Sequence, residues 1–163
     1  MTRIISFSVG LLFVLGSASS IAEGYWNVYG PTASITMTHP EAKKKDFVTV
    51  LVIRFVPDRE CDTEIGVSML TGAELGAPQR QQLAKRQMKV TIDGKSSWSD
   101  RTGVTQYSNG FEYAFIATGD LLAAIEAGDD LVAQLYPEGP SFGFPIAGAG
   151  DAFDQARLNC ELN

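Results

Sequence analysis

The chain has 163 residues, 45% of them hydrophobic and 20% charged, with 19 acidic residues against 13 basic ones and a formal net charge of −6. This length and apolar content are those of a single globular domain with a buried core. An acidic surface repels nucleic-acid phosphates and anionic lipids, so the composition excludes proteins that bind phosphate backbones through a basic patch. The one basic run, Lys43 to Lys45, is short.

The first 22 residues have the layout of a secretory signal peptide. One positive charge, Arg3, precedes an apolar run, and small residues that include Ser20 and Ala22 precede the expected cut. The apolar run is shorter than the roughly 20 residues that a membrane-spanning helix needs. We therefore expect cleavage of residues 1–22, no stable membrane insertion afterwards, a periplasmic or secreted location, and one mature domain over residues 23–163.

The two cysteines, Cys61 and Cys160, lie far apart in the sequence. An exported chain meets an oxidising compartment, where a pair of this kind forms a disulfide. A redox or metal site would require closely spaced thiols or several histidine ligands, and the chain has a single histidine, His39. We therefore predict one disulfide, which joins the last element of the chain to the end of the central strand, and we expect no metal and no cofactor.

The apolar run at residues 47–57, FVTVLVIRFVP, predicts the central strand of the fold. Both alternating faces of the run are apolar, and only Arg54 interrupts one of them. A β-branched run with this pattern predicts a strand covered on both sides. Shorter strands are expected before it, at residues 25–29 and 34–38.

The stretch after the central strand predicts a half-exposed strand with an acidic outer side. Glu60, Asp62 and Glu64 alternate with apolar residues, so their carboxylates share one face. Two interpretations are open: the three side chains hold Ca²⁺, which prefers oxygen ligands, or they form a solvated strand edge whose charges block edge pairing. We retain Glu60, Asp62 and Glu64 as candidate binding residues.

Two Asx-Gly dipeptides, starting at Asp93 and at Asn109, predict β-hairpin turns. If the second is a two-residue turn, Ser108 pairs with Phe111 across the hairpin. The strand after that turn then places three aromatic residues in the core: Phe111, Tyr113 and Phe115. Further strands are expected at residues 130–136 and 141–147.

Two helices are predicted, at residues 118–131 and 147–160. Thr118 or Asp120 can cap the first, and Gly128 ends it. The residues of the second helix that we expect to pack inward are Ala152, Phe153, Ala156 and Leu158. The whole pattern predicts a mainly β fold, an antiparallel β-sandwich of about eight strands with a short helix and a C-terminal helix docked on it.

The C-terminal half of the sequence also carries a family resemblance. The run AFIATGDLLAAIEAGDDLVAQLY, then SFGFPIAGAGDAF and a cysteine, resembles the exported invasion-associated locus B type proteins of Gram-negative bacteria. In that pattern a strand reaches a Gly-x-x-x-Ala turn that opens the last helix, here at Gly148 and Ala152. The paired cysteines expected in the family's middle region are absent, and residues 96–100 stand there instead. The resemblance implies a non-enzymatic envelope protein and no catalytic residues.

No arrangement of reactive side chains in the sequence predicts an enzyme. His39 lies beside Pro40 in a polar turn, and no Gly-x-Ser-x-Gly motif is present. Trp98 stands among polar residues, where it is either an exposed contact residue, since tryptophan is enriched at interface hot spots, or a partly buried residue that caps the sandwich.

We therefore expect a non-catalytic exported module that binds a protein or envelope partner, with its oligomeric state open. The alternative is a small exported hydrolase that uses carboxylate or serine residues. A deep cleft with two or more carboxylates would favour the hydrolase, and a flat face bearing Trp98 would favour the binding module.

Overall fold

The computed structural model describes residues 25–38, 48–70, 87–108, 110–136 and 139–162. The expected signal peptide, His39 and the Lys43 to Lys45 run lie outside these ranges. None of the helices in the described ranges is both long and apolar enough to cross a membrane.

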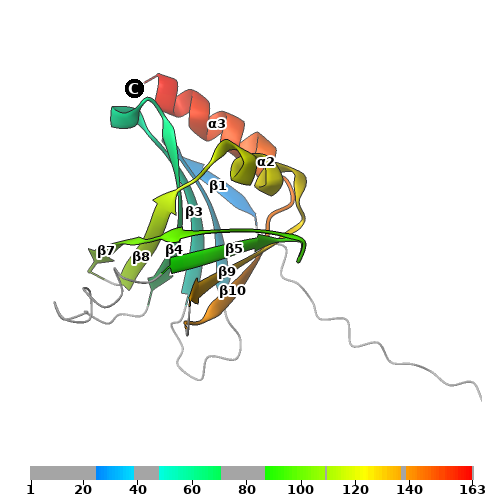
Figure 1. Cartoon of the computed structure of the whole chain (residues 1–163). Coiled ribbons are helices and arrows are strands. Elements are labelled where there is room, and N and C mark those ends of the chain that lie inside the picture. The colour runs from blue at the N-terminus through cyan, green and yellow to red at the C-terminus, as the bar shows by residue number, and fades with distance from the viewer. Residues whose placement is uncertain (1–24, 39–47, 71–86, 109, 137–138, 163) are drawn as a thin grey trace, which may run out of the picture.

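Ten strands and two α-helices are present in this part of the chain, so the predicted fold class is confirmed with more strands than expected. One antiparallel sheet contains β1 (Trp26–Tyr29), β2 (Thr32–Thr38), β3 (Val48–Val56), β4 (Asp62–Leu70), β8 (Gly110–Ile116) and β7 (Gly103–Tyr107), in that spatial order. The other contains β10 (Ser141–Pro145), β9 (Asp130–Tyr136), β5 (Gln87–Ile92) and β6 (Ser96–Arg101). The remaining elements are the 3-10 turn η1 (Pro57–Arg59) and the helices α2 (Gly119–Ala127) and α3 (Ala149–Glu161) (Figure 1).

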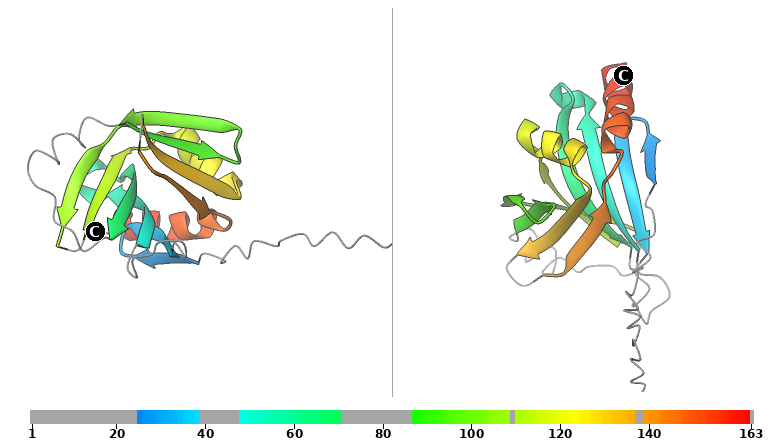
Figure 2. Two further views of the ribbon diagram at one scale, coloured as in Figure 1. Left: turned by 90° about the horizontal axis from the view of Figure 1, so that it is seen from below. Right: turned by 90° about the vertical axis from the view of Figure 1, so that its right-hand side faces the viewer.

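The buried residues of the two sheets and the two helices form one hydrophobic cluster. The aromatic residues of β8 belong to it as predicted, since Phe111, Tyr113 and Phe115 are all buried. The two sheets are joined directly where β6 continues into β7 through the buried residue Thr102. The polypeptide therefore changes sheets at this corner without a loop (Figure 2).

The two faces of the central strand β3 differ in cover among the described residues, so the prediction of cover on both faces is confirmed only in part. Leu51, Ile53 and Phe55 are fully buried on one face. On the other face Val52 is buried, with 8% of its surface exposed, whereas Val50 is half-buried. Valine also suits the pleated, half-exposed surface of a sheet, so a run of valines does not require a second layer. We call this second face of the six-stranded sheet its outer face.

Helix α3 packs against the inner face of the six-stranded sheet. The ring of Phe153 meets Trp26 of β1 edge to face at 5.4 Å and Phe55 of β3 at 6.3 Å between ring centroids. The indole nitrogen of Trp26 also donates a hydrogen bond to the carbonyl oxygen of Ile146, just before the helix, at 3.3 Å. The helix is therefore part of the core and covers the side of the sandwich next to β1 and β2 (Figure 2).

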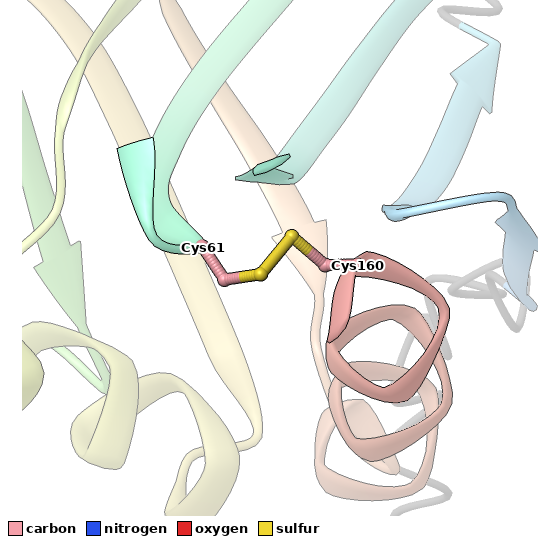
Figure 3. The surroundings of a disulfide bond; sticks show 2 residues. All are labelled: Cys61 and Cys160. Atoms are coloured by element: carbon pink, nitrogen blue, oxygen red, sulfur yellow. A yellow bond between two sulfur atoms is a disulfide. The ribbon is translucent and has the colours of Figure 1, made fainter. Parts of the chain in front are cut away.

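A disulfide between Cys61 and Cys160 is present, as predicted, with the two Cα atoms 6.1 Å apart. Cys61 follows η1 at the end of β3, and Cys160 lies in the last turn of α3. Figure 3 shows the bond crossing from the turn to the helix. It ties the last element of the described chain to the exit of the central strand.

One inward position predicted for α3 is wrong. Ala152, Phe153 and Ala156 are buried as expected, but Leu158 is 55% exposed. Residues that share a helix face are spaced three or four apart, and this spacing continues from Ala156 to Cys160 rather than to Leu158.

The second hairpin has a register two residues away from the predicted one. Tyr107 pairs with Gly110, and Gly110 is therefore a strand residue rather than a turn residue. Gly110 lies within β8, where a Cβ atom would come within 2.0 Å of the carbonyl oxygen of Met69 on β4. This glycine therefore serves the close approach of two strands. The shift of two preserves the alternation of faces, which explains why the aromatic core was predicted correctly.

The first hairpin forms as predicted and is also bound to a neighbouring strand. Asp93 and Gly94 both have positive φ, and the Lys95 amide donates to the Ile92 carbonyl oxygen at 2.9 Å. The Asp93 carboxylate accepts backbone hydrogen bonds from Asp130 at 3.0 Å and Asp129 at 3.1 Å. These bonds lower the pKa of Asp93 below its ordinary value of 3.8.

We expect Phe153→Ala to lower the free energy of unfolding by about 3 to 5 kcal/mol, through lost burial and the cavity left behind. Leu158→Ala on the exposed side of the same helix is the matched control, with an expected change within about 0.5 kcal/mol. Urea denaturation of the oxidised protein measures both. Equal losses would show that α3 is not packed into the core.

The lowered pKa of Asp93 predicts a pH dependence of stability. A carboxyl group whose pKa is lower in the folded state stabilises the fold above its unfolded pKa, and this contribution is lost as the pH falls through the folded value. We expect Asp93→Asn, which suits positive φ, to lower the melting temperature near neutral pH. The difference from the wild type should shrink as the pH falls below 3.8. Asp62→Asn is the control for loss of an exposed carboxylate, and a pH-independent difference would contradict the assignment.

Candidate functional site

The outer face of the six-stranded sheet carries a network of charged side chains, which we call the Arg54–Glu112 network. Arg54 lies on β3, Glu64 and Ser68 on β4, Tyr107 on β7 and Glu112 on β8. These residues are neighbours because the sheet order places β3, β4, β8 and β7 side by side. Arg59 joins the network from η1.

Glu112 is buried, with only 3% of its surface exposed, although it lies on the outer face. Its carboxylate accepts two hydrogen bonds from the same Arg54 nitrogen, Nη2, at 3.1 and 3.2 Å. Ser68 donates its hydroxyl to the same carboxylate at 2.9 Å, and the Tyr107 hydroxyl lies 3.5 Å away. A buried carboxylate needs such partners, because an unpaired buried charge is strongly destabilising.

Gly66 leaves room for this contact across β4. A Cβ atom at Gly66 would lie 3.2 Å from Cγ of Glu112 and 3.2 Å from Cβ of Ala114. A side chain there would be crowded against β8, next to the place where Glu112 meets Arg54. The glycine thus serves the packing of the network.

Arg54 is the centre of the network. Its Nη1 donates to Glu64 at 3.1 Å while its Nη2 holds Glu112. Partial burial alone would lower the pKa of Arg54, but the charge of Glu112, its hydrogen bond and smaller contributions from Tyr107 and Glu64 outweigh burial, so the pKa is raised. The pKa of Tyr107 is raised as well, first by burial and then by the charge of Glu112. Both groups therefore keep their protons at neutral pH.

Glu64 connects Arg54 to a second cation. Its Oε2 accepts from Arg54, and its Oε1 accepts from Nη2 of Arg59. Two arginines thus face two glutamates, Glu64 and Glu112, and the four formal charges cancel. The network is a neutral, hydrogen-bonded unit.

A hollow of about 320 Å³ opens above this network. Its lining residues are Arg54, Glu64, Asp100, Arg101, Gly103, Thr105, Glu112, Ala114, Phe115 and Ile116. Asp100 and Arg101 come from the end of β6, where the chain turns into β7, so the corner between the two sheets forms one wall.

The structure does not bring the predicted acidic residues together on a strand edge. Glu60 lies in the turn after η1 with positive φ, and Asp62 is the first residue of β4. β4 is an interior strand between β3 and β8, so the interpretation as a strand edge is wrong. Only Glu64 belongs to the hollow, and both of its oxygens accept hydrogen bonds from arginines. Across the described part of the chain, no cluster of three or more His, Cys, Asp or Glu side chains has a geometry suited to a metal ion.

Trp98 is half-buried and packs against the core from β6, as the interpretation as a capping residue requires. Its indole nitrogen donates to Asp120 of α2 at 2.8 Å. The pKa of Asp120 is lowered by hydrogen bonds from Thr118 and from Trp98. Trp98 is not among the lining residues of the hollow, so carboxylates and tryptophan lie in different places. A role of Trp98 in binding stays a prediction.

Sequence reasoning missed the two residues at the centre of the network. Arg54 was recognised only as an interruption of an apolar face, and Glu112 was not singled out. The signal that was available is that each is a single charged residue inside an otherwise apolar strand, where an ion pair is the usual solution.

The sequence matches no known family model, and no curated protein matches it. Among solved structures, the chain is similar to the crystal structure of invasion associated protein B from Bartonella henselae. The TM-score is 0.50 at 13% sequence identity, over 85% of this chain and 99% of that chain. The chain therefore shares a fold with that protein, and the predicted structural resemblance is confirmed.

We expect Glu112→Gln to lower the free energy of unfolding by about 1 to 3 kcal/mol, because it removes one charge of a buried pair whose other member is partly solvated. Glu126→Gln is the matched control, because it removes one charge from the more exposed pair with Arg157, whose side chain is 40% exposed. Such surface pairs contribute about 0 to 1 kcal/mol. Urea denaturation at constant ionic strength measures both, and equal effects would show that the network does not hold the sheet together.

Proposed function

We propose that this protein is an exported, non-catalytic accessory module that binds a protein or envelope partner through the hollow above the Arg54–Glu112 network. The observation that carries the proposal is a buried glutamate on the outer face of a sheet, held by an arginine at the base of an open hollow. A β-sandwich does not need a buried charged residue on the outer face of a sheet to form its core. Side chains fixed by mutual hydrogen bonds instead provide a preorganised polar surface, which reduces the entropy lost on binding.

The same geometry argues against a hydrolase that uses these carboxylates. A catalytic carboxylate must lie within hydrogen-bond reach of the substrate atom that it serves. Glu64 and Glu112 instead face arginines, since Arg54 binds both of them and Arg59 binds Glu64. Ser68 donates its hydroxyl to Glu112, but it is buried beneath the network and accompanied by no histidine among the described residues. The arrangement therefore supports recognition rather than bond cleavage.

Export is supported by three features. The N-terminal sequence has the order of a signal peptide, with Ser20 and Ala22 before the expected cut. Cys61 and Cys160 form a disulfide, a bond typical of oxidising compartments. The fold is shared with an invasion-associated bacterial protein. Together they favour a periplasmic or secreted location.

The proposal is tested by photocrosslinking in the native cells. A photoreactive amino acid replaces Thr105, which lines the hollow, in the full-length chain with its leader. We expect a discrete covalent adduct in the extracytoplasmic fraction after irradiation. The same replacement at Lys89, exposed on β5 in the other sheet, is the control and should give none.

Retention of the protein in the cytoplasm would contradict the export part of the proposal. Absence of any adduct at Thr105, or equal adducts at Thr105 and Lys89, would contradict binding through the hollow.

A further inference from the structure

We infer that the hollow binds a carboxylate group of the partner, which Arg101 holds while a neighbouring aliphatic side chain of the partner packs on Ile116. This inference rests on the proposed function and names the chemistry by which the partner is recognised. It follows from the position of Arg101 beside the hollow, from its free guanidinium and from the apolar surface next to it.

Arg101 stands on the same side of the chain as the residues of β7 that line the hollow. β6 continues into β7 through the buried residue Thr102, and side chains alternate between the two sides of an extended chain. The outward positions around this corner are therefore Arg101, Gly103 and Thr105. All three are exposed and line the hollow. Because the middle residue is glycine, no side chain of this extended segment lies between Arg101 and Thr105.

The guanidinium of Arg101 has no partner in the described part of the chain. Every other arginine in that part forms an ion pair with a carboxylate. Arg101 uses only its backbone amide, which donates to the Asp100 carboxylate at 2.6 Å. A guanidinium has five N–H donors in a planar fork that matches the two oxygens of a carboxylate. Arg101 can therefore receive a carboxylate without losing an existing contact.

The charge balance of the hollow favours a carboxylate over a phosphate group. The two glutamates of the Arg54–Glu112 network are neutralised by its two arginines. Of the charged lining residues, this leaves Arg101 and Asp100 without an oppositely charged partner in the described ranges. A carboxylate has one negative charge, which one free guanidinium balances, whereas a phosphate group carries about −1.5 to −2.

Arg101 is a better binding group than Asp100. The Asp100 carboxylate already accepts a backbone N–H, whereas the side-chain donors of Arg101 are unused. A guanidinium is weakly hydrated, and arginine is enriched at interfaces and their hot spots while aspartate is depleted. The net charge of −6 opposes an acidic partner only weakly, because exposed charges more than about 8 Å apart are largely screened at physiological ionic strength. Local pairing with Arg101 therefore decides the sign of the bound charge.

The floor of the hollow beside Arg101 is apolar. Ala114 pairs with Gly103 across β7 and β8, and Ile116 is the next residue on the same face of β8. Both line the hollow, and Ile116 is 52% exposed. An aliphatic group that covers Ile116 would exclude water from the ion pair and strengthen its attraction. The hollow is therefore suited to a carboxylate that has an aliphatic neighbour.

The test uses capped tripeptides, acetyl-Leu-Glu-Leu-amide and the same peptide with glutamine or lysine in place of glutamate. A further glutamine peptide with a free C-terminal carboxylate separates a chain end from an acidic side chain. Binding to the isotope-labelled, oxidised mature protein is measured by changes in amide chemical shifts. We expect the glutamate peptide to bind at least about tenfold more tightly than the capped glutamine and lysine peptides. The largest shifts should occur at Arg101, Gly103 and Ile116.

Arg101→Gln provides the decisive variant, because it removes the guanidinium and keeps a polar side chain. Lys95→Gln is the matched control, since it removes the same charge from the exposed turn at the other end of the β5–β6 hairpin. Both variants should keep the wild-type melting temperature, because both side chains are exposed. We expect Arg101→Gln to weaken binding of the glutamate peptide at least about tenfold and Lys95→Gln to leave it unchanged.

Binding of the glutamate peptide that is no tighter than that of the capped glutamine peptide, or that Arg101→Gln does not weaken, would overturn the inference. Preference for the lysine peptide, lost in Asp100→Asn, would show that the hollow takes a basic group instead. Equal affinity for the free-acid glutamine peptide and the glutamate peptide would support a carboxylate site that also accepts the end of a chain.

Photocrosslinking at Thr105 in cells separates this inference from the proposed function. We expect Arg101→Gln to abolish the adduct that the otherwise unchanged chain forms. An adduct that persists in Arg101→Gln would show that the hollow binds a partner but not through a carboxylate on Arg101. A protein that binds the glutamate peptide through Arg101 and gives no adduct at Thr105 would contradict the proposed function and leave the carboxylate site standing.

Discussion

The structure depends on how α3 is held against one side of the sandwich. On the opposite side β6 runs directly into β7 and joins the sheets covalently, whereas β1 and β10 are the outermost described strands of their sheets and do not pair with each other. α3 supplies the missing cover with Phe153, and the disulfide from Cys160 to Cys61 fixes its last turn. A helix with few large apolar residues gains from this bond, because a crosslink between distant positions restricts the unfolded chain by roughly 4 to 5 kcal/mol in the entropic account.

The disulfide is also close in sequence to two residues of the candidate site. Cys61 follows η1, which carries Arg59, and precedes Glu64 on β4 by a few residues. The pairing of Arg54 directly opposite Glu64 sets the register of β3 on β4, and the contact from Arg54 to Glu112 extends it to β8. A slip of one residue would send these side chains to the core face, so the network makes the register specific. Fold and site therefore share one constraint at the exit of the central strand.

The local sequence pattern was enough to predict most elements. It did not predict which strands pair when they are distant in the sequence. The alternation of apolar and polar residues located the aromatic core of β8 and the buried face of β4, because each of these features depends only on the sequence of one strand. β6 was not recognised as a strand, because its serines and charged residues show no apolar alternation. Gly110 was taken for a turn residue because its close approach to Met69 arises from a strand distant in sequence. The contact of Arg54 with Glu112 requires the order β3, β4, β8, which skips three strands of the chain.

The two faces of the six-stranded sheet also differ in what their residues indicate about function. Residues of the inner face must fill one core, and many sequences satisfy that requirement, as a shared fold at 13% identity illustrates. The outer face is under no such requirement, and a buried ion pair there often contributes no more stability than apolar side chains of similar size. Glu112 is paired with Arg54 there, and both residues line a hollow beside β7. Polar side chains held by mutual hydrogen bonds at the base of an open hollow form a preorganised surface, and a preorganised surface loses less entropy when a partner binds.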